Sequence, residues 1–229
     1  MLPQILLLGA TGRTGRLVLD EGLKRGYLVT ALIRKTNTDI PQHSNLTVVI
    51  GDPCKASDVE VALDSTKASI PIIIISTLGQ TRTSGNPWAA TTSPPRFMAT
   101  SVEAVLSASQ SFAEPARIHK LVILSSFGTG DSFASLNFMM QWIMKSSNMA
   151  QTLEDHNLVD EAVKAGPLPF VLVRSAMLKS GDAAPLKFYG NTGKGSGIMP
   201  GTNMKSIANF LLDLTVDDQY DGTTPMVTN

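Results

Sequence analysis

The chain has 229 residues, with 19 basic and 19 acidic side chains and a single cysteine, Cys54. Balanced charge gives no general attraction to nucleic acids or anionic membranes, and one cysteine excludes an intrachain disulfide framework and a multi-thiolate metal site. The first residues lack the basic region of a signal peptide, and the apolar run at residues 5–8 is too short to span a bilayer. We therefore expect a cytoplasmic protein with no nucleic-acid or membrane partner; the oligomeric state stays open.

In chain order, short apolar and β-branched runs predict strands, and segments of helical periodicity predict helices between them. Strands are expected at residues 5–8, 27–33, 46–50, 72–75, 121–124 and 170–173, with a late edge strand at 225–228. Helices are expected at residues 13–25, 56–63, 94–109, 136–165 and 206–214. This alternation predicts an α/β fold, a Rossmann-type doubly wound parallel sheet with helices on both faces, forming a single domain over residues 1–229. Two segments rich in Gly, Pro, Ser and Thr, at 81–95 and 190–203, are expected to be functional or disordered loops.

The glycine turn between the first strand and the first helix is the most informative segment. Gly9 lets the chain leave the strand sharply, Gly12 lets a pyrophosphate approach the backbone, and Gly15 lets the helix pack against the sheet. The free N–H groups and partial positive charge of the helix N-terminus favour a phosphate there. The alternative is a tight strand-to-helix turn with no ligand.

The end of the second strand indicates which dinucleotide is preferred. NAD sites place an acidic residue there to bind the ribose hydroxyls, whereas this chain has Arg34 and Lys35. Two cations suit a 2′-phosphate, and Arg13 is a further candidate contact, so the sequence favours NADP(H). The alternative is that Arg34 and Lys35 are solvated surface charges.

With these residues in view, the chain resembles the atypical short-chain dehydrogenases/reductases of the NAD(P)-binding, NmrA-like type. The resemblance rests on residues 5–12, Gly51 with Asp52, the run 121–126 and the strand 170–174; within the group, residues 155–156 and 217–222 are most similar to the flavin reductases of the biliverdin reductase B type. The resemblance implies a set of cofactor-binding residues: Gly9, Thr11, Gly12, Arg13, Thr14 and Gly15 at the pyrophosphate, Arg34 and Lys35 at the adenosine phosphate, Asp52 and Pro53 at the adenine, Thr77, Leu78 and Gly79 along the ribose, and Ser125. It places Ser126 beside the nicotinamide.

The chain departs from that family at the proton relay. The superfamily uses a Tyr-x-x-x-Lys pair, but none of the three tyrosines here is followed by a lysine four residues later. The nearest imitation is Trp142 with Lys145, and an indole does no acid–base work at neutral pH. Asn157 stands at the family's lysine position, and Arg174-Ser175 replaces the usual Arg-Pro.

Three residues remain as catalytic candidates. Ser126 can donate a hydrogen bond to a substrate oxygen, or it can simply cap its strand. His156 titrates near neutrality and can act as an acid or base, although a histidine beside Glu154 and Asp155 is more often solvated. Lys145 can supply the positive charge near the ribose that the family's lysine would otherwise provide. The histidines are too scattered for a metal site, so no metal is expected.

Aromatic and methionine side chains are expected around the substrate mouth, with plain core packing as the alternative: Trp88, Phe97, Met139, Met140, Trp142, Phe188 and Tyr189. Cys54 is expected to be a buried, inert thiol.

The leading hypothesis is an NADPH-dependent oxidoreductase that transfers hydride to a small apolar or aromatic substrate such as a quinone, flavin, enone or ketone. The alternatives are a non-redox isomerase, epimerase or cyclase on the same scaffold, and a non-enzymatic NADP-binding regulatory protein.

Overall fold

The computed structural model describes residues 2–35 and 39–229, and its centre is a largely parallel sheet. The strands lie in the order β3-β2-β1-β4-β5-β6-β10-β8, and every neighbouring pair is parallel except β10 and β8. Their bounds are β1 Gln4–Leu8, β2 Val29–Ile33, β3 Leu46–Ile50, β4 Ile72–Ser76, β5 Ile118–Ser126, β6 Phe170–Ser175, β8 Lys187–Phe188 and β10 Met226–Thr228. Every residue of β1, β2 and β4 is buried, as their continuous apolar sequences predict for central strands covered on both faces.

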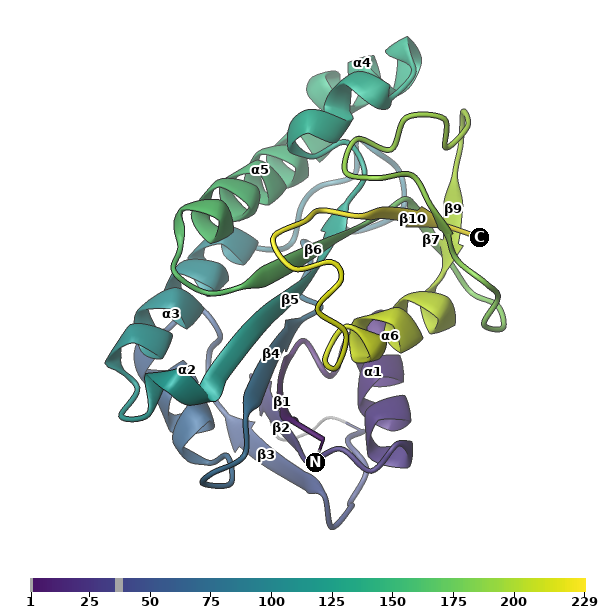
Figure 1. Cartoon of the computed structure of the whole chain (residues 1–229). Helices are drawn as coiled ribbons and strands as arrows, with labels where there is room; N and C mark the ends of the chain where they lie inside the picture. The colour runs from purple at the N-terminus through teal and green to yellow at the C-terminus, as the bar shows by residue number, and fades with distance from the viewer. Residues whose placement is uncertain (1, 36–38) are drawn as a thin grey trace.

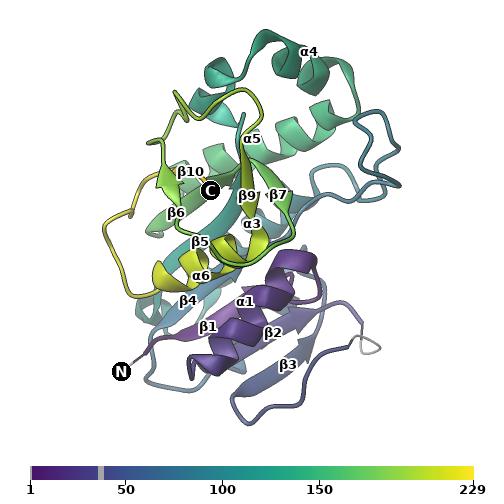
Figure 2. The same cartoon turned by 90° about the vertical axis from the view of Figure 1, so that its right-hand side faces the viewer.

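Helices cover both faces of this sheet (Figure 1). On one face lie α1 (Arg13–Lys24) and α6 (Met204–Asp213), packed on Ile5, Leu7 and their neighbours. On the other face lie α2 (Ala56–Asp64), α3 (Phe97–Ser111) and α5 (Met149–Ala165), packed on Leu6, Leu8 and their neighbours. Figure 2 shows α1 and α6 side by side in front of the sheet. The predicted Rossmann-type α/β fold is therefore confirmed.

Shorter elements gather beyond the carboxyl ends of the strands, on the side of the molecule where α4 is drawn in Figure 1. They are α4 (Phe138–Ser146), the 3-10 helix η2 (Gly130–Ser135), and a two-stranded sheet of β7 (Met177–Lys179) and β9 (Gly201–Asn203). A second 3-10 helix, η1 (Pro115–Arg117), leads into β5. In the part of the chain that the structure describes, no helix is long and apolar enough to cross a membrane.

Several predicted boundaries were wrong. The helix predicted from residue 94 begins at Phe97, because Pro94 and Pro95 disfavour helical geometry in the residues before them and Arg96 has a left-handed φ of 55°. The helix predicted over 136–165 is broken at Ser147 and Asn148 into α4 and α5. The strand predicted at 225–228 forms as β10, but it is not at the edge, because the two-residue β8 pairs with it antiparallel.

The segment 81–95, expected to be a functional or disordered loop, is an ordered hairpin. Arg82 and Thr91 form an antiparallel bridge, and the Thr83 N–H donates to the Ala90 carbonyl at 3.0 Å. At the base, the Thr92 N–H donates to the Thr81 carbonyl at 2.8 Å. We call residues 81–95 the hairpin below.

Candidate functional site

The glycine turn closes tightly on the end of β4. Gly9 has a left-handed φ of 90°, and a Cβ there would lie 2.7 Å from the Thr77 Oγ1. A Cβ on Gly15 would lie 2.0 Å from the Gly9 carbonyl oxygen, so the helix contacts the turn itself and the residue after β4, Thr77. Gly15 was predicted to allow packing of the helix on the sheet; the structure shows that its main constraint is this closer contact with the turn.

Gly12 differs from the other two glycines of the turn. Its φ of −79° is ordinary, and the Gly9 carbonyl oxygen at 3.2 Å is the one neighbour within 4 Å of an added Cβ among the described residues. The space beside Gly12 is therefore open, which is the condition for a phosphate to approach the backbone there.

The first turn of α1 suits an anion. It has neither a side-chain cap nor an acidic residue, and its ladder of hydrogen bonds begins with the Arg16 N–H donating to the Gly12 carbonyl at 2.8 Å. The start of α3 is different, because there the Asp155 carboxylate accepts from the N–H groups of Met98 and Ala99 at 3.0 and 2.8 Å. The residues of the glycine turn thus fit the pyrophosphate of a dinucleotide.

A cleft of about 310 Å³ lies at the carboxyl ends of the central strands. Ligands of doubly wound sheets bind at this edge, where the strand order reverses between β1 and β4. The cleft is lined by the glycine turn, the residues after β4, the ends of β5 and β6, α5 and β7: Arg13, Thr14, Thr77, Leu78, Gly79, Gln80, Thr81, Leu124, Ser125, Ser126, His156, Ser175, Ala176 and Leu178.

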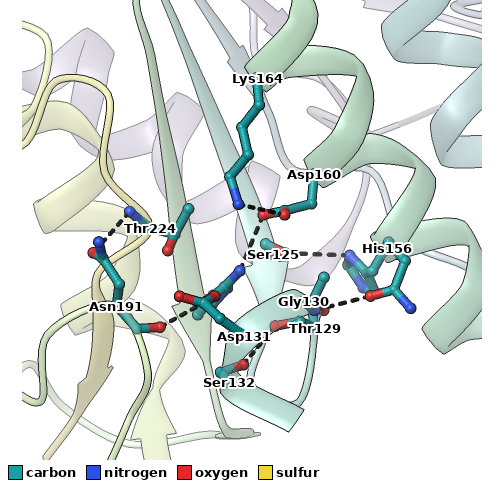
Figure 3. Close-up of polar contacts among 12 residues, drawn as sticks. Ser125, Thr129, Gly130, Asp131, Ser132, His156, Asp160, Lys164, Asn191 and Thr224 are labelled. Carbon is teal, nitrogen blue, oxygen red and sulfur yellow. Dashed lines mark hydrogen bonds and ion pairs between the residues drawn. The ribbon is translucent and has the colours of Figure 1, made fainter.

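His156 and Ser125 face each other in this cleft (Figure 3). The His156 Nδ1 lies 3.5 Å from the Ser125 Oγ, and only 9% of His156 is exposed. Burial lowers the pKa of His156 to about 4, and the nearby Asp155 carboxylate offsets part of this effect. The imidazole is therefore neutral at physiological pH. The solvated position weighed above for this histidine was wrong, because α5 turns Asp155 and His156 inward.

Ser126 lies at the end of β5 and also lines the cleft. Its hydroxyl donates to the Phe127 carbonyl at 3.2 Å, and Ser126 itself is partly exposed. Both roles considered for this residue are compatible with that position, since a hydroxyl that caps the strand can turn toward a substrate oxygen.

Lys145 and Asn157 are not among the residues that line the cleft. Lys145 is exposed on α4, its Nζ is 4.7 Å from the centroid of the Phe133 ring, and it is not among the residues that line the cleft. Asn157, at the family's lysine position, accepts a hydrogen bond from the Gly130 N–H at 2.9 Å and so holds η2. The structure therefore does not bring Lys145 to the cleft.

An ion network surrounds Arg174, the residue before the cleft-lining Ser175 in β6. Arg174 is fully buried in β6, with Asp160 of α5 at 3.0 Å, the Asn191 carbonyl at 2.6 Å and Asp131 of η2 as its partners. Lys164 pairs with Asp160 at 2.6 Å. Figure 3 shows Asp131, Asp160 and Asn191 converging from three segments of the chain. One sequence signal could have predicted this network: an arginine inside an apolar strand, which requires buried partners.

The residues predicted at the adenosine end lie on the exposed side after β2 and β3. Arg34 and Lys35 are exposed, and the Arg34 guanidinium is 5.7 Å from the centroid of the Phe97 ring. The Asp52 carboxylate accepts from the Cys54 N–H at 3.0 Å, and the buried Pro53 stands between them. Burial raises the pKa of the Cys54 thiol to about 11, which agrees with an inert cysteine, although the residue is half-buried.

Five of the residues predicted around the substrate mouth lie in three different environments. Trp88, Met139 and Trp142 are exposed, whereas Phe97 is buried in the core beneath Arg34. Phe188 stacks on Tyr220 near α6, with ring centroids 5.4 Å apart, so it belongs to a cluster at the β8 edge.

Gln80 was missed by the sequence analysis: it lines the cleft and its amide donates to Asp155 at 2.8 Å.

Comparison with known proteins agrees with this geometry. A family model described as NAD(P)H-binding matches residues 9–218. Among solved structures, the chain is similar to ChuY, an anaerobillin reductase of Escherichia coli O157:H7 (19% identity, TM-score 0.73), over 98% of this chain and 96% of that one. It is also similar to a short-chain dehydrogenase/reductase from Veillonella parvula solved with NADP (13% identity, TM-score 0.76, covering 100% of this chain and 95% of the other). A third is the oxidoreductase ylbE from Lactococcus lactis (17% identity, TM-score 0.73, covering 99% and 90%).

Proposed function

Because this chain belongs to the NAD(P)H-binding family, whose members bind a nicotinamide dinucleotide, we propose that it is an NADPH-dependent oxidoreductase. Its substrate is a small conjugated or carbonyl compound such as a quinone, flavin, enone or ketone. The names of two similar structures, a reductase and an oxidoreductase, support a redox activity.

One observation carries this proposal: a single cleft joins the glycine turn to the ends of β5 and β6. Arg13 and Thr14, predicted to bind the pyrophosphate, line one part, and Ser125, Ser126 and His156 line another. A dinucleotide held by the turn would direct its nicotinamide toward the two serines, as the family resemblance implies. When bound, the cofactor supplies the hydride; the protein positions the substrate and excludes water.

The proposed reaction uses no tyrosine–lysine relay. The residues that line the cleft include no tyrosine and no lysine. The neutral imidazole of His156 is a poor proton donor at pH 7, but it can exchange a hydrogen bond with Ser125 and fix that hydroxyl's orientation. Ser126 then donates a hydrogen bond to the substrate oxygen, and a conjugated product takes its proton from water. In this proposal Ser126 is the catalytic residue, and Ser125 and His156 position the cofactor.

The preference for NADPH is assigned to Arg34 and Lys35. Replacing both with alanine should weaken NADPH binding by about tenfold or more, because each charge-assisted contact contributes about 1.5–3 kcal/mol, and should leave NADH binding nearly unchanged. The measurement is fluorescence titration with each cofactor. Lys187→Ala, an exposed lysine in β8, is the control. An equal loss of affinity for NADPH and NADH would contradict the assignment.

The first test of the function is NADPH titration followed by NADPH oxidation with a quinone and with a flavin. Binding with turnover supports the oxidoreductase, and Ser126→Ala should then lower kcat with little change in NADPH affinity. Binding without turnover of these or of a ketone panel would favour a non-redox enzyme or a regulatory protein. Absence of binding would remove the basis of the proposal.

A further inference from the structure

An exposed apolar surface lies beside the cleft, and the function proposed above does not use it. It consists of six uncharged side chains from the hairpin, α4 and the loop before β9: Trp88, Phe138, Met139, Trp142, Ile198 and Met199. We call this set the apolar rim. Phe138 is 87% exposed, and the two tryptophans are 52% and 59% exposed, although large apolar side chains are costly to leave in water.

The rim is held in a defined arrangement. Asn137, at the start of α4, donates its side-chain amide to the Ile198 carbonyl at 3.0 Å. Asn148, after the end of α4, donates to the carbonyls of Trp88 and Ala89 at 2.9 and 3.1 Å. The rings of Trp88 and Trp142 then lie 6.2 Å apart, tilted by 55°. One asparagine at each end of α4 thus fixes a loop against the helix.

Both loops connect the rim directly to the walls of the cleft. The hairpin begins at Thr81, which lines the cleft, and carries Trp88 at its far end. The other loop ends in β9, where Thr202 pairs with Leu178 of β7, a second lining residue. Along α5, His156 lies about two turns, roughly 12 Å, beyond Asn148. The rim therefore lies near the cleft, at about that distance from His156 along α5.

We propose that the apolar rim binds an uncharged apolar extension of the substrate, reaching roughly 10 Å or more from the reacting ring, and that Trp88 and Trp142 are specificity-determining residues. This rests on the proposed function only in that the reacting ring lies beside Ser126. The rim side chains are apolar and suit an uncharged extension, and the two loops that connect the rim to the cleft walls favour a substrate over a separate protein partner.

The test uses two acceptors that differ only in the extension: a dimethoxy-methyl-benzoquinone with a decyl chain and the same ring without the chain. The wild-type KM should be about tenfold lower for the decyl compound, because burial of even two methylenes is sufficient for that factor. Trp88→Ala/Trp142→Ala should raise the KM for the decyl compound about tenfold and leave its kcat, and both constants for the bare ring, unchanged.

Matched controls are Ile50→Ala and Val61→Ala, which remove exposed apolar groups at β3 and α2. Neither should alter the KM for the decyl compound. Equal KM values for the two acceptors in the wild type, or an equal rise for both in the double variant, would overturn the proposal. So would a dimer in sedimentation that the double variant dissociates without a change in KM, because the rim would then join two copies.

A second measurement separates this inference from the proposed function. Trp88 and Trp142 are the only tryptophans of the chain, so tryptophan emission reports the rim alone. Titration with the decyl quinone should shift the emission to shorter wavelength, in the wild type and in each single tryptophan variant, while the bare ring should not. If no acceptor is reduced, a shift still supports the rim as a binding surface, and the absence of a shift overturns it.

Discussion

At the scale of single residues, Gly12 and Gly15 have different reasons to be glycine, and the same substitution separates them. Gly12→Ala should lower the melting temperature without cofactor far less than Gly15→Ala, because its φ is ordinary and the added Cβ would lie 3.2 Å from a single atom, the Gly9 carbonyl oxygen. It should weaken NADPH binding by tenfold or more by filling the space for phosphate. Gly15→Ala should instead destabilise the free protein, because its Cβ would overlap the Gly9 carbonyl. Thermal unfolding with and without NADPH measures both; a stable Gly15→Ala would contradict this reading.

His156 should make the folded state sensitive to acid. Its folded pKa is about 4 and its ordinary value is 6.5, so the unfolded chain binds the proton more readily and stability falls as pH drops from about 6.5 toward 4. The expected loss between pH 7 and pH 4.5 is on the order of 2 kcal/mol. Urea unfolding should be measured at both pH values for the wild type and for His156→Leu. In the variant, this part of the decrease in the free energy of unfolding at acid pH should be absent. His119→Leu, an exposed histidine, should retain it; identical slopes in all three proteins would contradict the assignment.

At the scale of elements, Arg174 joins β6, α5, η2 and the loop after β8 in one ion network. Arg174→Met should lower the free energy of unfolding by about 3–5 kcal/mol, because Asp160 would lose one partner in a buried position. Arg96→Met breaks an ion pair with Glu103 in which both side chains are more than half exposed, and should cost less than about 1 kcal/mol. Chemical denaturation compares the two variants, and similar losses would show that burial does not govern this network.

The elements that the sequence predicted well are those with a local cause. The apolar runs of β1 and β4 indicate central strands by themselves, and the glycine turn marks the start of α1. The break between α4 and α5 depends on tertiary contacts of Asn148, and the two-residue β8 pairs with a strand nearly forty residues later, so neither has a local signal. The same distinction holds in the site. The glycine turn has a local sequence signal, whereas the inward direction of His156 follows from Asp155 binding the start of α3.

For the whole molecule, cofactor binding and folding should be linked. NADPH at a hundred times its dissociation constant should stabilise the fold by about 2.7 kcal/mol, which corresponds to a rise in melting temperature of about 5–10 °C for a domain of this size. Differential scanning fluorimetry over a range of NADPH concentrations measures the rise. NADH at the same concentration should give a smaller one if Arg34 and Lys35 select the phosphate. Equal rises would contradict the NADPH preference, and no rise with either would contradict binding at the glycine turn.

The two edge strands of the sheet, β3 and β8, also differ in how they can pair with a strand of another chain. β8 offers only two residues at its edge, whereas β3 offers five, and Val48 and Ile50 in β3 are exposed. Polymerisation by strand addition needs two receptive edges on each molecule, because every added chain must in turn accept the next. A chain with one receptive edge can pair once, and the pairing then closes on itself. If folded molecules associate through these edges, growth should therefore stop at two chains and not continue into fibres, which sedimentation would measure.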